Sequence, residues 1–239
     1  MLKPIVRRWL RRYCLTPNTV RYVIEYRSVK RAFERLSQGG ILLDAGAGSG
    51  EMSLKLYREG FCSKLIGVEP FESNYKLLVQ NYAECANVET CQAPLEKIPA
   101  ANASVDYVLS TQVFEHIKDH DRAAAEVVRV LKPGGHLIIS VPHPPERFPN
   151  EDHVRPGYTE EDLVQLFSPL GMEHLLTDYF FTLPTQRRLI AAGELPFRGI
   201  YLPIAWADRE KHLSNEERRH GSPGAILCLF GKRLEKAIA

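Results

Sequence analysis

Asp44 and the glycine-rich loop Gly46–Gly50 are the residues of this chain best suited to hold a ligand. Residues 41–43 before them are apolar, as in a buried strand, and a helical pattern follows from Glu51. Glycine lacks a Cβ atom, so the loop backbone can turn sharply and let a ligand come close. Free N–H groups at the start of a helix favour nucleotide-like ligands. The spacing therefore predicts such a ligand at a strand-to-helix loop.

Polar residues also end the next two predicted strands. Glu69 closes the strand at residues 64–69, and Gln92 closes the strand at residues 88–92 and is followed by Ala93. In an open α/β sheet, ligands bind at the carboxyl ends of the strands. An ionised carboxylate only accepts hydrogen bonds, so Glu69 is suited to the two hydroxyls of a ribose. Gln92 and Ala93 are placed to meet the edge of an adenine ring.

The glycine spacing distinguishes two kinds of nucleotide ligand. Dinucleotide-binding loops follow G-x-G-x-x-G, whereas here Gly50 comes one position early and Glu51 stands where the last glycine should be. No arginine adjoins Glu69 to hold a 2′-phosphate. The carboxylate of Asp44 would repel a pyrophosphate but attract a ligand with a cationic centre and an ammonium group. The loop therefore disfavours an NAD-type cofactor.

Predicted strands and helices alternate from Ile41 onward. Strands are expected at residues 41–44, 64–69, 88–92, 106–110, 136–141, 173–181 and 225–234. Helices are expected at residues 18–36, 51–58, 72–83, 121–131 and 160–167, and a turn at Lys132–Gly135. This alternation is typical of a doubly wound α/β sheet with helices on both faces. Its crossovers should be right-handed.

Four strings of residues, taken in order, resemble the motifs of the class I S-adenosylmethionine-dependent methyltransferases. They are Leu42–Gly50, Val68–Pro70, Asp106–His116 and Arg129–Leu137, the last of which contains R-x-L-K-P-G-G. The likeness is to the small-molecule branch that includes the ubiquinone/menaquinone-biosynthesis type. It implies a Rossmann-like methyltransferase fold with seven strands, the last of them antiparallel. It also implies an enzyme that uses S-adenosylmethionine and releases S-adenosylhomocysteine.

The resemblance further implies which residues contact the cofactor. The methionine part would lie in the glycine-rich loop, the ribose on Glu69 and the adenine beside Pro70 and Phe71. The sulfonium end would lie above the segment that follows the fourth strand. The implied set is Asp44, Gly46, Ala47, Gly48, Glu69, Pro70, Gln92, Ala93, Ser110, Thr111 and Gln112. Many relatives carry an aspartate at the position of Gln92, whose amide oxygen can still accept a hydrogen bond from an adenine amino group.

Methyl transfer from a sulfonium depends mainly on holding donor and acceptor in line. A general base helps where the acceptor is a hydroxyl or an acidic carbon. The candidate bases are histidines, because imidazole titrates near neutral pH, and they are His116, His143 and His153. His116 follows Glu115 in a string that could instead serve to order its loop. The five cysteines show no C-x-x-C spacing, so no metal site is expected.

The chain is expected to form a single methyltransferase domain. Its parts are a basic helical extension (1–36), a cofactor-binding core (37–145) and an acceptor-side half (146–239) with an insertion at 182–222. The first 35 residues hold ten Lys and Arg against two acids, but the whole chain has a net charge of only +2, which does not suggest a nucleic-acid binder. Residues 4–14 are a candidate amphipathic helix, either packed on the domain or in peripheral contact with anionic lipid through residues 1–14. No apolar run is long enough to span a bilayer, and the cysteine usage fits a reducing cytoplasm.

The predicted function is transfer of a methyl group to a small-molecule acceptor, first at oxygen, with nitrogen and carbon left open. The alternatives are a regulatory protein that binds the cofactor without catalysis and an NAD-type oxidoreductase. A nucleic-acid methyltransferase is less favoured, because Ser110–Val113 lacks an Asn/Asp-Pro-Pro-aromatic string. The aromatic residues around the 182–222 insertion could wall a ring-shaped acceptor or form a small core of their own. They are Phe180, Phe181, Phe197, Tyr201 and Trp206.

Overall fold

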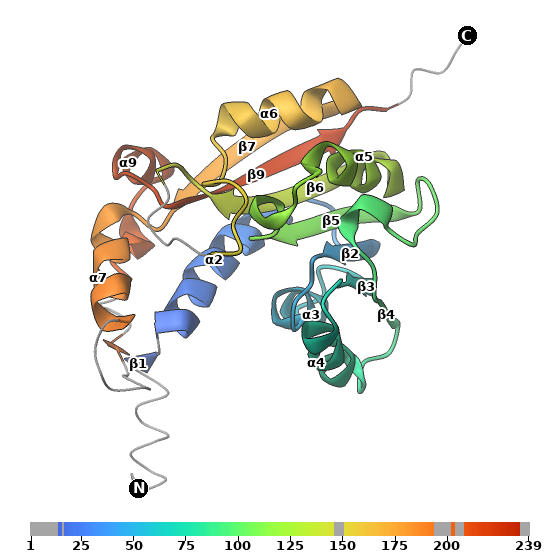
Figure 1. Ribbon diagram of the computed structural model, residues 1–239, viewed down its shortest axis with the longest axis horizontal. Coiled ribbons are helices and arrows are strands. Elements are labelled where there is room, and N and C mark those ends of the chain that lie inside the picture. Colours follow the sequence, from blue (N-terminus) through green and yellow to red (C-terminus); the bar gives the residue numbers. More distant parts are fainter. Residues whose placement is uncertain (1–13, 16, 146–150, 194–201, 204–207, 235–239) are drawn as a thin grey trace, which may run out of the picture.

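A seven-stranded sheet dominates the computed structural model (Figure 1), which describes residues 14–15, 17–145, 151–193, 202–203 and 208–234. The strand order is β4-β3-β2-β5-β6-β9-β7. The strands are β2 Ile41–Ala45, β3 Lys64–Val68, β4 Val88–Cys91, β5 Val105–Thr111, β6 Leu131–Pro142, β7 Met172–Phe180 and β9 Ala225–Lys232. Strand β9 runs antiparallel between β6 and β7, and the other neighbours are parallel. The expected mostly parallel sheet with an antiparallel last strand is confirmed.

Helices connect most of these strands. They are α2 Pro17–Phe33, α3 Glu51–Arg58, α4 Glu72–Tyr82, α5 His120–Val130, α6 Glu160–Phe167, α7 Leu183–Gly193 and α9 Asn215–His220, with single 3₁₀ turns η1 Leu95–Lys97, η2 Phe114–His116, η3 Ser168–Leu170 and η4 Glu210–His212. A reciprocal pair of hydrogen bonds between Thr159 and Asp162 caps α6 and starts it where the sequence predicts. Two short strands, β1 Cys14–Leu15 and β8 Leu202–Pro203, pair antiparallel apart from the main sheet.

The sheet separates two apolar cores. Successive side chains of a strand point to opposite faces. Leu42 of β2 therefore joins the lower core, between the sheet and helices α2, α3 and α4, whereas Leu43 joins the upper core, between the sheet and helices α5 and α6. Figure 1 shows α5 and α6 above the sheet, with α2, α3 and α4 below it. Both faces are therefore covered, as a doubly wound sheet requires.

Residues Lys132–Gly135 form a bulge within β6, and the expectation of a turn before that strand is wrong. Strands β5 and β6 pair on either side of these residues, with a break in register between the two pairings. Gly134 adopts φ +78°, a conformation that favours glycine. The Lys132 ammonium donates to the Asp106 carboxylate at 2.8 Å and pins the bulge to the start of β5. This part of the motif therefore supports the fold.

Helix α2 forms ion pairs with residues from the last third of the chain. Arg27 forms an ion pair with Asp208 at 2.8 Å, and Arg31 pairs with Asp178. Asp178 is buried and also accepts a hydrogen bond from the Arg218 guanidinium at 2.6 Å. Because α2 also contributes apolar side chains to the lower core, it is an integral layer of the domain.

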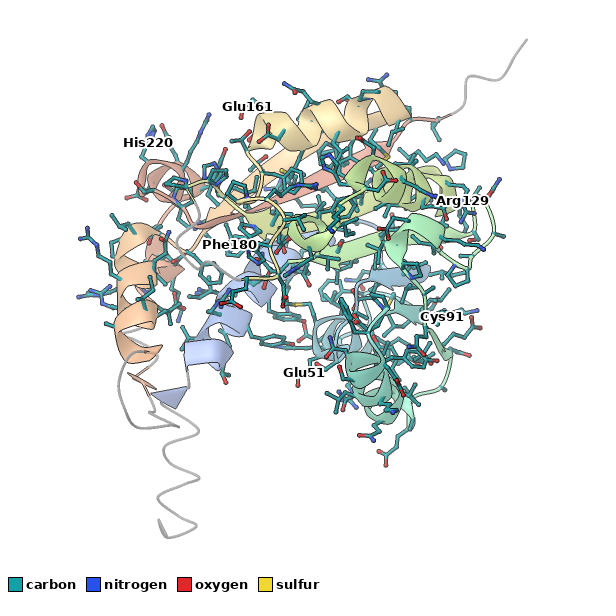
Figure 2. The ribbon with its side chains drawn as sticks, in the orientation of Figure 1. Glu51, Cys91, Arg129, Glu161, Phe180 and His220 are labelled. Carbon is teal, nitrogen blue, oxygen red and sulfur yellow. The ribbon has the colours of Figure 1, made fainter. Side chains whose placement is uncertain are left out.

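The insertion after β7 contains α7, η4 and α9. Phe180 and Phe181, which were candidates for an acceptor wall, are 1% and 3% exposed and belong to the core with α2 (Phe180 is labelled in Figure 2). Phe197, Tyr201 and Trp206 lie outside the described residues.

The predicted amphipathic helix at residues 4–14 also lies outside the described residues, apart from Cys14 in β1. Its proposed lipid contact stays a prediction. Among the helices that the structure describes, none combines the length and apolar character needed to cross a membrane.

Candidate functional site

The loop Gly46–Gly50 joins β2 to α3 and lies against the end of β3. The backbone N–H groups of Gly46 and Ala47 both donate to the last carbonyl of β3 at 2.9 Å. Gly46, Gly48 and Gly50 have φ of +83°, +55° and +76°. A Cβ at Gly46 or Gly50 would lie 2.5 Å from a neighbouring side chain, whereas a Cβ at Gly48 would meet nothing within 4 Å. Close packing therefore requires glycine at positions 46 and 50, whereas Gly48 borders open space.

Asp44 lies beneath this loop and is only 2% exposed. Its carboxylate accepts a hydrogen bond from the Ser53 hydroxyl of α3, which also bonds the Tyr82 hydroxyl at 2.7 Å. Burial raises the pKa of Asp44 to about 7; the Ser53 hydrogen bond opposes this rise, and the nearby charge of Glu69 adds to it. Asp44 thus holds the first turn of α3 under the loop. The contact with a methionine group that the family resemblance implies stays a prediction.

Glu69 follows β3 and connects two loops. Its Oε2 accepts the Gly48 N–H at 2.9 Å, and its Oε1 accepts the Phe71 N–H at 3.1 Å and the Asn74 side-chain amide at 3.4 Å. The side chain is 3% exposed, so its orientation is fixed. Two carboxylate oxygens offer about four acceptor positions, and these three bonds leave capacity for a ligand hydroxyl.

A rim of exposed groups lies beside Glu69, at the ends of β3 and β4. The Phe71 side chain is 67% exposed, although it is large and apolar. Gln92 is exposed as well, and its side-chain amide donates to the Pro70 carbonyl at 3.4 Å, while Ala93 packs on the upper core. A free aromatic face beside an amide is suited to stack on a base and bond its edge.

Ser110, Thr111 and Gln112 lie where β5 ends, next to the glycine-rich loop in the sheet order. Ser110 is fully buried and donates to the Ala45 carbonyl at 3.1 Å, so it ties β5 to β2. Gln112 adopts φ +55°, which is uncommon for a residue with a side chain. The strand therefore ends at Thr111, and both Thr111 and Gln112 lie at the carboxyl edge of the sheet.

Glu25 of α2 reaches the same edge and was missed from the sequence. One of its carboxylate oxygens accepts from the Gln112 amide at 3.1 Å and from the Ser140 hydroxyl at 2.6 Å. Burial raises the pKa of Glu25, although both hydrogen bonds and the charge of Arg21 oppose this rise. The available signal was its place beside Ile24 on the apolar stripe of the predicted helix, in a segment with only two acids.

His116 and His153 come together although they are far apart in sequence. Their ring centroids are 4.6 Å apart and nearly perpendicular. His116 Nδ1 bonds the Asp152 carbonyl at 3.1 Å, and the adjacent Glu115 is fully buried. One ligand atom from each of Glu115, His116 and His153 lies within 4.8 Å of the other two.

His143, the third candidate base, does not join this cluster. It follows β6 and its ring lies 6.2 Å from that of Tyr179, on the α6 side of the sheet. Burial lowers the pKa of His143. Within the described part of the chain its buried Nδ1 has no hydrogen-bond partner. The structure therefore unites two of the three predicted histidines.

Several known proteins are similar to this chain in sequence. A family model described as a methyltransferase domain matches residues 43–139. A probable S-adenosylmethionine-dependent methyltransferase of Mycolicibacterium smegmatis is 29% identical over 156 residues, covering 62% of this chain and 59% of the relative. The ubiquinone/menaquinone biosynthesis C-methyltransferase of Escherichia coli is 29% identical over 123 residues, covering 50% of this chain and 46% of the relative. The chain thus spans about half the length of these curated relatives.

A solved structure extends the likeness to the whole sheet. The N-methyltransferase NodS of Bradyrhizobium japonicum, in complex with S-adenosyl-L-homocysteine, superposes with a TM-score of 0.60 at 13% identity. The superposition covers 87% of this chain and 85% of that protein. Residues 43–139 are therefore similar to a methyltransferase domain, and the described sheet has the Rossmann-like fold that the class I methyltransferase NodS also has.

Proposed function

We propose that this protein transfers a methyl group from S-adenosylmethionine to a small-molecule acceptor, at oxygen, and releases S-adenosylhomocysteine. The observation that carries the proposal is the bond between Glu69 and the Gly48 N–H, which joins two family motifs at one sheet edge. The match of residues 43–139 to a methyltransferase domain supports the same reaction.

The residues at this edge fit the cofactor. The open side of Gly48 leaves room for the amino-acid part of the ligand, and Glu69 retains acceptor capacity for ribose hydroxyls. Phe71 would stack on the adenine, with Gln92 and Ala93 at its edge. Thr111 and Gln112 would lie at the sulfonium end. When bound, the cofactor supplies an electrophilic methyl group.

The chain's part in the reaction is mainly positioning. Glu25 holds the Gln112 side chain through its hydrogen bond and thereby shapes the floor on which donor and acceptor would meet. His116 and His153 lie in the loops after β5 and β6 and are the groups suited to handle the acceptor's proton. His143 follows β6 and does not join this pair.

Calorimetric titration tests the donor assignment. We expect one S-adenosylhomocysteine to bind per chain, whereas NAD should not bind. Binding of NAD without binding of S-adenosylhomocysteine would overturn the proposal and favour an oxidoreductase.

Radiolabelled methyl transfer tests the acceptor. The panel should include hydroxy compounds, amines and compounds with acidic carbons, and labelled product is expected among the hydroxy compounds. Cofactor binding without turnover on any member would favour a regulatory protein that has no catalytic activity.

A further inference from the structure

Two loops at the carboxyl edge of the sheet bring together three side chains that could bind a metal ion, and no sequence motif indicates this. Glu115 and His116 belong to η2 after β5, whereas His153 belongs to the loop after β6. One atom from each residue lies within 4.8 Å of the atoms of the other two. Sequence signals for a metal site, such as paired cysteines, do not occur here, and only the fold brings His153 beside Glu115 and His116.

The chemical identity of the three groups favours a transition-metal ion. One carboxylate and two imidazoles form a common donor set for Zn²⁺ and other first-row divalent ions, and three protein ligands leave coordination positions open. Mg²⁺ and Ca²⁺ prefer oxygen donors throughout. The set is therefore typical of a reactive centre rather than of a closed structural site.

The tautomer of His116 is already that of a metal ligand. A backbone carbonyl can only accept a hydrogen bond, so His116 Nδ1 must donate its proton to the Asp152 oxygen, 3.1 Å away. The lone pair of the neutral ring is then on Nε2. Histidine ligands in metal sites are usually oriented by such a hydrogen bond to a carbonyl or carboxylate.

The loop that carries His153 is held in place by its neighbours. The Val154 N–H donates to the Glu115 carbonyl at 2.9 Å. The Arg155 guanidinium donates to the carbonyls of Phe114 at 3.3 Å and Lys118 at 3.2 Å. These bonds flank the cluster on both sides, so its three ligands do not depend on a bound ion for their approach.

We propose that Glu115, His116 and His153 bind one first-row divalent transition-metal ion with positions open to the methyl acceptor. The catalytic role of the ion rests on the proposed function. The acceptor hydroxyl binds the ion, which lowers the pKa of that hydroxyl, and the proton passes to water. His116 and His153 thus assist the loss of this proton as ligands of the ion, in place of acting as bases. The resulting oxygen anion attacks the methyl carbon as the carbon–sulfur bond breaks, and the electron pair stays on sulfur.

Cobalt binding tests the site on the full chain after treatment with a chelator and dialysis. Co²⁺ should bind at one ion per chain, give a visible ligand-field absorption and be displaced by Zn²⁺ but not by Mg²⁺. The variants His116→Ala and His153→Ala should each weaken Co²⁺ binding by at least about 100-fold, the upper end of the loss seen when only a supporting residue is removed.

His220→Ala is the matched control, because this exposed histidine lies on α9 and is not part of the cluster (His220 is labelled in Figure 2). The variant should bind Co²⁺ like the original protein. His153→Cys should keep the ion and add a sulfur-to-cobalt charge-transfer band, because thiolate is also a good ligand for these ions. Co²⁺ binding that is absent, or equal in all of these variants, would overturn the proposal.

S-adenosylhomocysteine titration of the same samples separates the two proposals. Both histidine variants should still bind it, with a dissociation constant within about threefold of the original. Metal binding without cofactor binding would refute the proposed function and leave the metal site standing. Cofactor binding without metal binding would refute the metal site alone.

Discussion

The proposed donor side and the proposed acceptor side of this sheet edge are built in different ways. On the donor side, the glycine-rich loop, Glu69 and Phe71 come from consecutive strand ends, and hydrogen bonds of 2.9 and 3.1 Å join them. On the acceptor side, His116 meets His153, and Glu25 meets Ser140 across 115 residues. Neighbouring motifs thus define the donor, whereas only long-range packing assembles the groups around the acceptor. The following predictions test this division.

The largest effect is expected from Asp44→Asn, a change beneath the donor loop. The folded carboxyl, with its pKa of about 7, keeps a proton that the unfolded chain has already lost, so raising the pH favours unfolding. Between pH 4 and pH 8 the free energy of unfolding should fall by up to about 4 kcal/mol more in the original protein than in the variant. Urea denaturation across this range measures the difference. Asp121→Asn, at an exposed position, should leave the pH dependence unchanged, and parallel curves for Asp44→Asn would contradict the prediction.

Glu69→Ala should weaken S-adenosylhomocysteine binding by about 100-fold, because two hydrogen bonds to a charged acceptor would be lost. The fold should persist, since β3 and its core contacts do not involve this side chain. Calorimetry measures the dissociation constant, and a thermal melt checks the fold. The exposed neighbour Glu72→Ala provides a baseline. A dissociation constant unchanged by Glu69→Ala would remove the ribose assignment.

Glu25→Ala should lower the free energy of unfolding by about 2 kcal/mol, because it deprives the Ser140 hydroxyl and the Gln112 amide of their shared acceptor. Denaturant titration measures this against Glu34→Ala, at an exposed position in the turn that follows the same helix. Cofactor binding should change far less than in Glu69→Ala. If Glu25→Ala and Glu69→Ala raised the dissociation constant of S-adenosylhomocysteine equally, the distinction between the donor side and the acceptor side would be wrong.

Gly48→Ala should have the smallest effect on stability, about 1 kcal/mol, which is the cost of a left-handed conformation for alanine. The added methyl group meets no atom within 4 Å, so the loss should appear mainly in cofactor affinity. Gly46→Ala, whose Cβ would lie 2.5 Å from Val113, should instead lower the melting temperature strongly. Equal melting temperatures for the two variants would show that the loop tolerates both positions alike.

The fold was predictable because its signals are local. Each predicted strand and helix of the region 41–142 recurs in the structure within a few residues, since apolar runs, glycines and capping residues act on their own segment. The error at Lys132–Gly135 has a physical reason. A Pro-Gly-Gly string favours a turn when read alone, but the flanking residues both pair with β5 and draw the string into the strand.

The site was predictable only in part. Glu69 stands at the end of a strand, where ligands of an α/β sheet usually bind. Glu25, in contrast, lies inside a helix, and its partner Gln112 comes more than 80 residues later. The pairing of His116 with His153 depends on how the loop after β6 folds back, and no residue spacing encodes that path. Arg129, prominent in the motif, donates to the carbonyls of Ile98 and Ala100 and supports the fold (Figure 2).

The anchoring of α2 has a consequence for how the chain acquires its structure. The helix precedes the sheet in sequence, yet its charged partners, Asp178 and Asp208, follow it by 147 and 181 residues. Contacts between such distant residues form late, because a long loop must close first. During synthesis the region 41–142 can therefore gather into a sheet while one of its faces still lacks α2. The ion pairs that anchor α2 form only when the last third of the chain has emerged.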